Sequence, residues 1–134
     1  VMSANPLPVS KRIIQVCLFL VAAIALFGGT LQMFLGEPTI SPRLDNVHRF
    51  MAGVYFSMGL ISFWAAWTIR SQGTLIYLIA FGVFMGAVGR LVSMSIVGIP
   101  EPQGLWLGYL TPELVVPVII LIAQLAGRKA IKDA

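Results

Sequence analysis

The run "IIQVCLFLVAAIALFGGTLQMFL" at residues 13–35 decides the fold class, because more than twenty residues pass without one charged side chain. Three further apolar runs follow it, at about residues 47–69, 74–99 and 110–126, with Leu105 as an alternative start of the last. An α-helix rises about 1.5 Å per residue, so each run can cross a hydrocarbon core about 30 Å thick, the last only just. Since a lipid-facing backbone must satisfy its own hydrogen bonds, we expect helices. The sequence therefore predicts an all-α integral membrane four-helix bundle, forming a single transmembrane domain over residues 1–134.

The composition supports the same class. Hydrophobic residues make up 58% of the chain and charged residues only 10%, whereas a soluble domain carries about a quarter charged residues. A soluble chain of 134 residues is too small to bury so much apolar surface in one core. The first run is longer than the apolar core of a signal peptide, which has about 7–15 residues, so we expect it to stay as a membrane helix.

The basic residues predict the direction of the helices. Six of them fall on one side of the four runs and only Arg43 falls in a loop on the other; the six are Lys11, Arg12, Arg70, Arg128, Lys129 and Lys132. The positive-inside rule then places both termini in the cytoplasm and the 37–46 and 99–109 loops outside. We interpret the net charge of +4 as this topology signal and expect no nucleic-acid partner.

Charged residues inside the apolar runs predict a site. A charge within a membrane is costly and marks a functional position by default. With the predicted topology, Asp45, Arg49, Arg90 and Glu113 reach a similar depth in the outer half of the membrane. The full set of predicted ligand-binding residues is Asp45, Asn46, His48, Arg49, Arg90, Ser93 and Glu113. Two alternatives stay open: the ion pairs only fix the packing of the helices, and Arg49 pairs with either Asp45 or Glu113.

Helical periodicity predicts which faces pack. At about 100° per residue, Gly82, Gly86, Arg90 and Ser93 share one face of the third run. A matching stripe on the second run holds Asp45, Arg49, Ala52, Gly53, Phe56 and Gly59. Small residues on such stripes allow membrane helices to approach closely.

The start of the fourth helix is predicted from "TPE" at residues 111–113. Thr111 can cap a helix, Pro112 suits its first position, and Glu113 complements the helix dipole. Pro117 then removes the N–H that would bond the Glu113 carbonyl and predicts a bend. The nearby Trp106 is expected at the outer interface, as is Tyr109.

The sequence gives little support for a metal site or for redox chemistry. Cys17 is the single cysteine and His48 the single histidine, so the sequence holds no metal-binding spacing. We expect neither a metal nor another cofactor.

Four segments also resemble a known family. They are "LDNVHRFMAGVYFSMG" (44–59), "FGVFMGAVGRLVSM" (81–94), "GIPEP" (98–102) and "PELVVP" (112–117), and they resemble the bacterial membrane family of domain of unknown function 4345, in particular its AciT-like inner-membrane proteins. The marked elements of the family fall on Leu44, Asp45, Asn46 and Arg49, and on Gly89, Arg90 and Ser93. The resemblance implies a four-helix protein of the inner membrane of Gram-negative bacteria, with a role in cell-envelope integrity.

Three functional hypotheses follow. The first is the binding of an anionic amphiphile such as a membrane lipid, because arginine gives forked hydrogen bonds to phosphate. The second is a structural subunit that joins a membrane-protein partner through its glycine faces. The third is an enzyme acting on a membrane-embedded substrate, with His48 or Glu113 as acid or base; we consider an enzyme less well supported, since no nucleophile–base pair is present.

Overall fold

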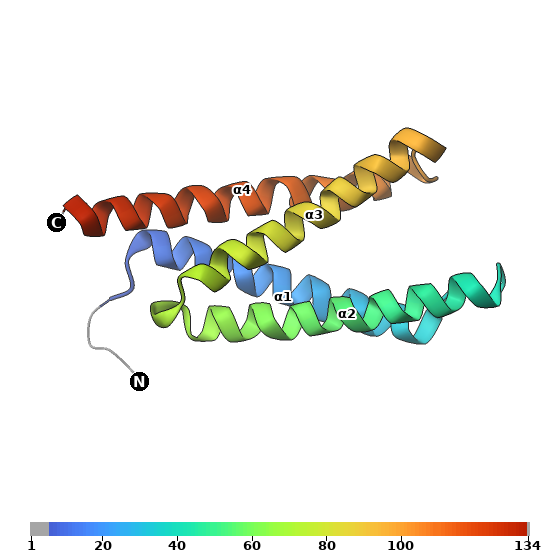
Figure 1. Cartoon of the computed structure of the whole chain (residues 1–134), viewed down its shortest axis with the longest axis horizontal. Helices are drawn as coiled ribbons and strands as arrows, with labels where there is room; N and C mark the ends of the chain where they lie inside the picture. Colours follow the sequence, from blue (N-terminus) through green and yellow to red (C-terminus); the bar gives the residue numbers. More distant parts are fainter. Residues whose placement is uncertain (1–5, 134) are drawn as a thin grey trace. The chain divides into compact units, whose positions relative to one another are not determined.

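The computed structural model of the chain consists of four long helices (Figure 1). It describes the backbone of residues 6–133 and the side chains of residues 6–129; the side chain of Lys132, which entered the topology prediction, lies outside that range. Within the described residues all four helices are long and apolar enough to cross a membrane, and no strand is found there. The predicted all-α, four-helix membrane class is therefore confirmed.

Helix α1 (Val9–Leu35) ends at a glycine for a conformational reason. Gly36 has φ +56°, in the left-handed region that disfavours residues with a Cβ. Its N–H bonds the Gln32 carbonyl at 2.9 Å, which completes the last turn of the helix.

Helix α2 (Pro42–Trp67) begins about one turn earlier than predicted. Ser41 caps it, because its side-chain oxygen accepts the Leu44 N–H at 3.0 Å, and Pro42 occupies the first turn, where its missing N–H costs nothing. The apolar pattern did not predict this start, because the first residues of α2 include charged and polar side chains. After α2, the short 3-10 helix η1 (Ile69–Ser71) leads into α3 (Thr74–Val97).

Helix α4 (Gln103–Asp133) corrects a prediction. Its start lies seven residues before the one expected at Leu110 and two before the alternative at Leu105. Thr111 is therefore not a cap; its hydroxyl instead donates to the Leu107 carbonyl one turn back, at 2.9 Å. Pro112 and Pro117 both lie inside the helix. Each removes one backbone hydrogen bond, and Glu113 lies between the two interruptions.

The chain divides into two compact units. One runs from Gln15 to Ile69 and holds most of α1 with α2; the other holds the start of α1, up to Ile14, and the chain from Arg70 onward, with α3 and α4. The predicted single transmembrane domain stays a prediction.

In the 15–69 unit, α1 and α2 approach closely at glycines. A Cβ on Gly29 would lie 2.9 Å from the Ala52 carbonyl oxygen, and one on Gly59 would lie 2.8 Å from the Leu26 side chain. Ala52 and Gly59 are both buried, as predicted for the α2 stripe. At the other end of the helix pair, the Gln15 side chain donates to the Ala66 carbonyl at 2.9 Å.

In the other unit, α3 and α4 lie side by side (Figure 1). Two basic residues of this unit are held by hydrogen bonds: Lys11 donates to the Gln72 carbonyl at 2.9 Å, and Arg128 donates to the Tyr77 hydroxyl at 3.4 Å. Which side of a membrane these residues face stays a prediction. The expected tight contact at Gly86 is not found within the unit, because a Cβ there would meet no described atom within 4 Å.

Candidate functional site

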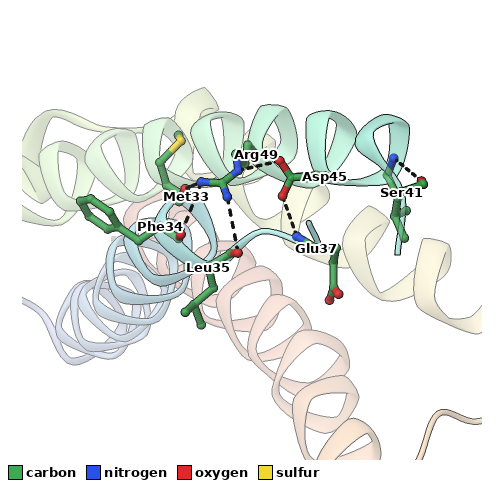
Figure 2. Close-up of polar contacts among 8 residues, drawn as sticks. Met33, Phe34, Leu35, Glu37, Ser41, Asp45 and Arg49 are labelled. Carbon is green, nitrogen blue, oxygen red and sulfur yellow. Dashed lines mark hydrogen bonds and ion pairs between the residues drawn. The ribbon is translucent and has the colours of Figure 1, made fainter. Parts of the chain in front are cut away.

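Arg49 closes the end of α1 (Figure 2). Its Nε donates to Asp45 Oδ2 at 2.9 Å. Its Nη1 donates to the carbonyls of Met33 at 2.5 Å and Phe34 at 3.4 Å, and its Nη2 to that of Leu35 at 3.5 Å. The last carbonyls of a helix have no partner in the helix itself, and a cation there also complements the helix dipole. Arg49 on α2 is therefore a cap for α1.

Asp45 links Arg49 to the backbone that follows the end of α1. While Oδ2 accepts from Arg49, Oδ1 accepts the Glu37 N–H at 2.8 Å. A Cβ on Gly36 would overlap this carboxylate, so only glycine leaves room for it. We name Asp45, Arg49, Gly36 and Glu37 the hairpin clasp. The clasp fixes the turn between α1 and α2.

The pairing of Arg49 is thereby decided: its partner is Asp45, one turn before it on the same helix. All three guanidinium nitrogens of Arg49 donate to protein oxygens. Little hydrogen-bonding capacity is left for a ligand, although 38% of the side chain is exposed. The geometry of Arg49 supports the structural interpretation of this residue.

Arg90 is held differently. Its Nε donates to Glu113 Oε2 at 2.7 Å, an ion pair that joins α3 to α4. Its guanidinium carbon lies 5.9 Å from the Trp106 ring centre and 5.7 Å from that of Tyr109, within the range of cation–π attraction. The two rings meet edge to face, with centroids 5.6 Å apart. We name Arg90, Glu113, Trp106 and Tyr109 the Arg90 cluster.

The Arg90 cluster keeps open hydrogen-bonding capacity. A guanidinium has five N–H donors, yet no described protein atom accepts from Nη1 or Nη2 of Arg90, and none donates to Glu113 Oε1. The two side chains are 33% and 18% exposed. An N–H without an acceptor is costly in an apolar medium, so in a membrane these groups require water or a ligand with oxygen atoms.

The other predicted site residues form no side-chain hydrogen bond within the part of the chain that the structure describes. Asn46 and Ser93 are exposed and His48 is half-exposed, and no side-chain hydrogen bond to any of them is found between residues 6 and 129. The hairpin clasp belongs to the 15–69 unit and the Arg90 cluster to the other. The prediction that all seven residues line one pocket stays a prediction.

Metal binding by the described side chains has no geometric support. Between residues 6 and 129, no three His, Cys, Asp or Glu side chains lie close enough to hold a metal ion.

Two members of the Arg90 cluster were not predicted as site residues. Trp106 and Tyr109 were assigned only to the membrane interface. Their spacing of seven and four positions before Glu113 contains the missing signal, since residues at those separations share a helix face. That signal requires a helix that starts before residue 106, as the alternative start at Leu105 gives; the start expected from Thr111, Pro112 and Glu113 lies after Tyr109.

A comparison with models of known protein families identifies the family of this chain. The model of the family described as a domain of unknown function, DUF4345, matches residues 13–124. The chain belongs to the DUF4345 family. The matched residues include both the hairpin clasp and the Arg90 cluster, so both lie within the DUF4345 region of the chain. No curated protein and no solved structure matches the chain. The protein is thus a small, multi-pass, four-helix member of DUF4345.

Proposed function

We propose that this protein binds the anionic group of an amphiphile, such as the phosphate of a lipid, at the Arg90 cluster, and thereby supports the integrity of a bacterial cell envelope from the inner membrane. One observation carries the proposal: the guanidinium of Arg90 is fixed on Nε by Glu113, while no acceptor for either Nη atom is found between residues 6 and 129. Two parallel N–H groups match two oxygens of a phosphate or carboxylate.

The comparison with Arg49 supports this choice. Both arginines lie in apolar helices and both pair with a carboxylate. The Nη atoms of Arg49 bond the carbonyls at the end of α1, whereas those of Arg90 have no such partners. An arginine that serves only to join helices gains most when all its donors are used. The unused donors therefore support a binding role for Arg90 and a structural role for Arg49.

The position of the cluster supports an amphiphile over a soluble anion. Arg90 lies on α3 and Glu113 on α4, both inside segments long and apolar enough to span a membrane. Apolar side chains flank them on the same helices; Leu91 and Val92 are exposed. A ligand that reaches this cluster from the bilayer brings its own hydrocarbon chains, which these side chains can contact.

Lipid retention tests the proposal. Wild type, Arg90→Gln and a control, Arg43→Gln, are purified in the same mild detergent, and the co-purified phospholipid per chain is measured by native mass spectrometry. Arg43 is exposed at the start of α2 and belongs to neither cluster, so its replacement controls for the lost charge. We expect Arg90→Gln to retain several-fold less phospholipid and the control to match wild type.

Equal retention by wild type and Arg90→Gln would overturn the proposal and leave Arg90 with a packing role. Arg90→Lys separates binding from folding, because lysine keeps the positive charge but cannot donate two parallel hydrogen bonds. This variant is expected to retain an amount of phospholipid between those of wild type and Arg90→Gln. In cells that lack the native chain, Arg90→Gln is expected not to restore resistance to detergent, while Arg43→Gln restores it.

A further inference from the structure

The charge balance of the Arg90 cluster narrows the class of ligand. Arg90 is the single charged residue of α3, and Glu113 is the single charged residue of α4 before Arg128. Because Arg90 and Glu113 form an ion pair, the cluster carries no net charge. A ligand with a large net negative charge gains attraction from the guanidinium but meets repulsion from the carboxylate beside it. The cluster is a dipole, not a cationic site.

Both Arg90 and Glu113 can form further hydrogen bonds. Among the described residues, neither Nη atom of Arg90 has an acceptor and Oε1 of Glu113 has no donor. A ligand that binds only Arg90 leaves Oε1 of Glu113 without a hydrogen-bond donor in an apolar environment, which is costly. The best complement supplies an anion to Arg90 and a hydrogen-bond donor to Glu113 at the same time.

The aromatic rings limit the kind of donor. A quaternary ammonium group has no N–H and is usually recognised by the faces of aromatic rings. Here the guanidinium of Arg90 already lies against Trp106 and Tyr109. With those rings in use, both kinds of ammonium are attracted to Glu113 by charge, but only a primary ammonium adds charge-assisted hydrogen bonds, which a trimethylammonium cannot make.

We propose that the Arg90 cluster recognises the phosphoethanolamine headgroup of a membrane lipid, with the phosphodiester on the Nη atoms of Arg90 and the primary ammonium on Glu113 Oε1. This inference rests on the proposed function and specifies its ligand. The headgroup is itself a zwitterion, so its negative phosphate can face the positive Arg90 while its positive ammonium faces the negative Glu113.

A competition among lipids of identical acyl chains tests the inference. The delipidated protein in detergent receives an equimolar mixture of phosphatidylethanolamine, phosphatidylglycerol and phosphatidylcholine, and bound lipids are counted by native mass spectrometry. We expect phosphatidylethanolamine to exceed each of the others by about threefold or more, which corresponds to about 0.7 kcal/mol, half the value of a tenfold change. N-methyl and N,N-dimethyl phosphatidylethanolamine keep the phosphate and the positive charge but lose donors, so their binding is expected to fall with each methyl group.

Glu113→Gln supplies the deciding comparison. It removes the negative charge and leaves Arg90 in place, so the cluster becomes cationic and the preference is expected to change from phosphatidylethanolamine to phosphatidylglycerol. Glu101→Gln makes the same change of net charge at an exposed position between α3 and α4 and is expected to keep the wild-type preference. The far-ultraviolet circular dichroism of each variant verifies its helical fold.

The two proposals fail in different ways. Equal phospholipid retention by wild type and Arg90→Gln overturns the proposed function. If Arg90→Gln loses lipid but wild type prefers phosphatidylglycerol or phosphatidylcholine, the phosphoethanolamine inference is overturned and the lipid-binding function stands. An unchanged preference in Glu113→Gln also overturns the inference.

Discussion

Arg90 Nε and Glu113 Oε2 lie 2.7 Å apart and join α3 to α4 through a charge-assisted hydrogen bond. The two residues are 23 positions apart in the chain, so the contact exists only because the two helices pack side by side. The pair has a structural role whether or not a ligand binds. Its contribution to stability can be separated from its role in binding.

A double-mutant cycle on Arg90→Gln and Glu113→Gln measures that contribution. In detergent, each single variant is expected to lower the free energy of unfolding by about 1–3 kcal/mol, because it leaves one charge partly buried without its partner. The double variant is expected to lose less than the sum, with a coupling of about 0.5–2 kcal/mol. Additive losses would contradict a direct interaction. Chemical unfolding followed by circular dichroism provides the measurement.

The hairpin clasp predicts a specific effect at Gly36. Replacement with alanine places a Cβ at φ +56° and against the Asp45 carboxylate. We expect a loss of about 1–3 kcal/mol, the usual cost of a strained backbone position, measured as a lower midpoint of thermal unfolding. Gly104→Ala is the matched control, since Gly104 lies in the first turn of α4 and has neither a positive φ nor a neighbour within 4 Å of an added Cβ. A similar loss in both variants would contradict the clasp.

Arg49→Lys tests the guanidinium hydrogen bonds of the hairpin clasp. Lysine keeps the charge, but a single ammonium cannot reach the Asp45 carboxylate and the carbonyls of Met33 and Leu35 as a planar guanidinium does. Unfolding in detergent is expected at a lower temperature, with a loss of about 1–2 kcal/mol for the lost hydrogen bonds. Arg43→Lys, at an exposed position on the same helix, should unfold like wild type. Phospholipid retention should not change in Arg49→Lys, because the proposed ligand binds at Arg90.

Glycine contacts predict where the helices tolerate added volume. Gly29→Ala brings a Cβ to 2.9 Å from the Ala52 carbonyl oxygen, whereas Gly86→Ala meets nothing within 4 Å. The first variant is expected to lose about 1–3 kcal/mol through overpacking, and the second to match or exceed wild type because alanine favours the helix. Thermal unfolding of the pair in one detergent provides the comparison. The opposite ranking would contradict the close approach of α1 and α2.

The predicted direction of the helices can be tested with single cysteines. Cys17→Ser gives a cysteine-free background, into which Thr39→Cys or Gly73→Cys is introduced. A maleimide that cannot cross membranes is expected to label position 39 in intact cells and position 73 only after the inner membrane is opened. This result follows if the side with more arginine and lysine faces the cytoplasm. The reverse pattern would invert the topology.

Much of the site was visible in the sequence because a charge in an apolar helix is conspicuous. Asp45, Arg49, Arg90 and Glu113 were each identified as charges in or beside an apolar run, and each has an ion-pair partner in the structure. The choice of partners was not visible, since Asp45 and Glu113 were equally plausible for Arg49. The start of α4 was misassigned for a related reason: Pro112 is typical of a first turn, but a membrane helix tolerates it inside.

The sequence by itself determined the number and class of the helices, because the length and hydrophobicity of a segment decide whether it can replace water with lipid, and neither depends on what the segment packs against. Only the tertiary structure decided how each arginine is used. Hydrogen bonds depend on the positions of atoms from other helices, to within a few tenths of an ångström, and no periodicity in one segment specifies those positions. The carbonyls at the end of α1 therefore occupy Arg49, while the packing of α3 against α4 leaves the Nη atoms of Arg90 open between a carboxylate and two aromatic rings.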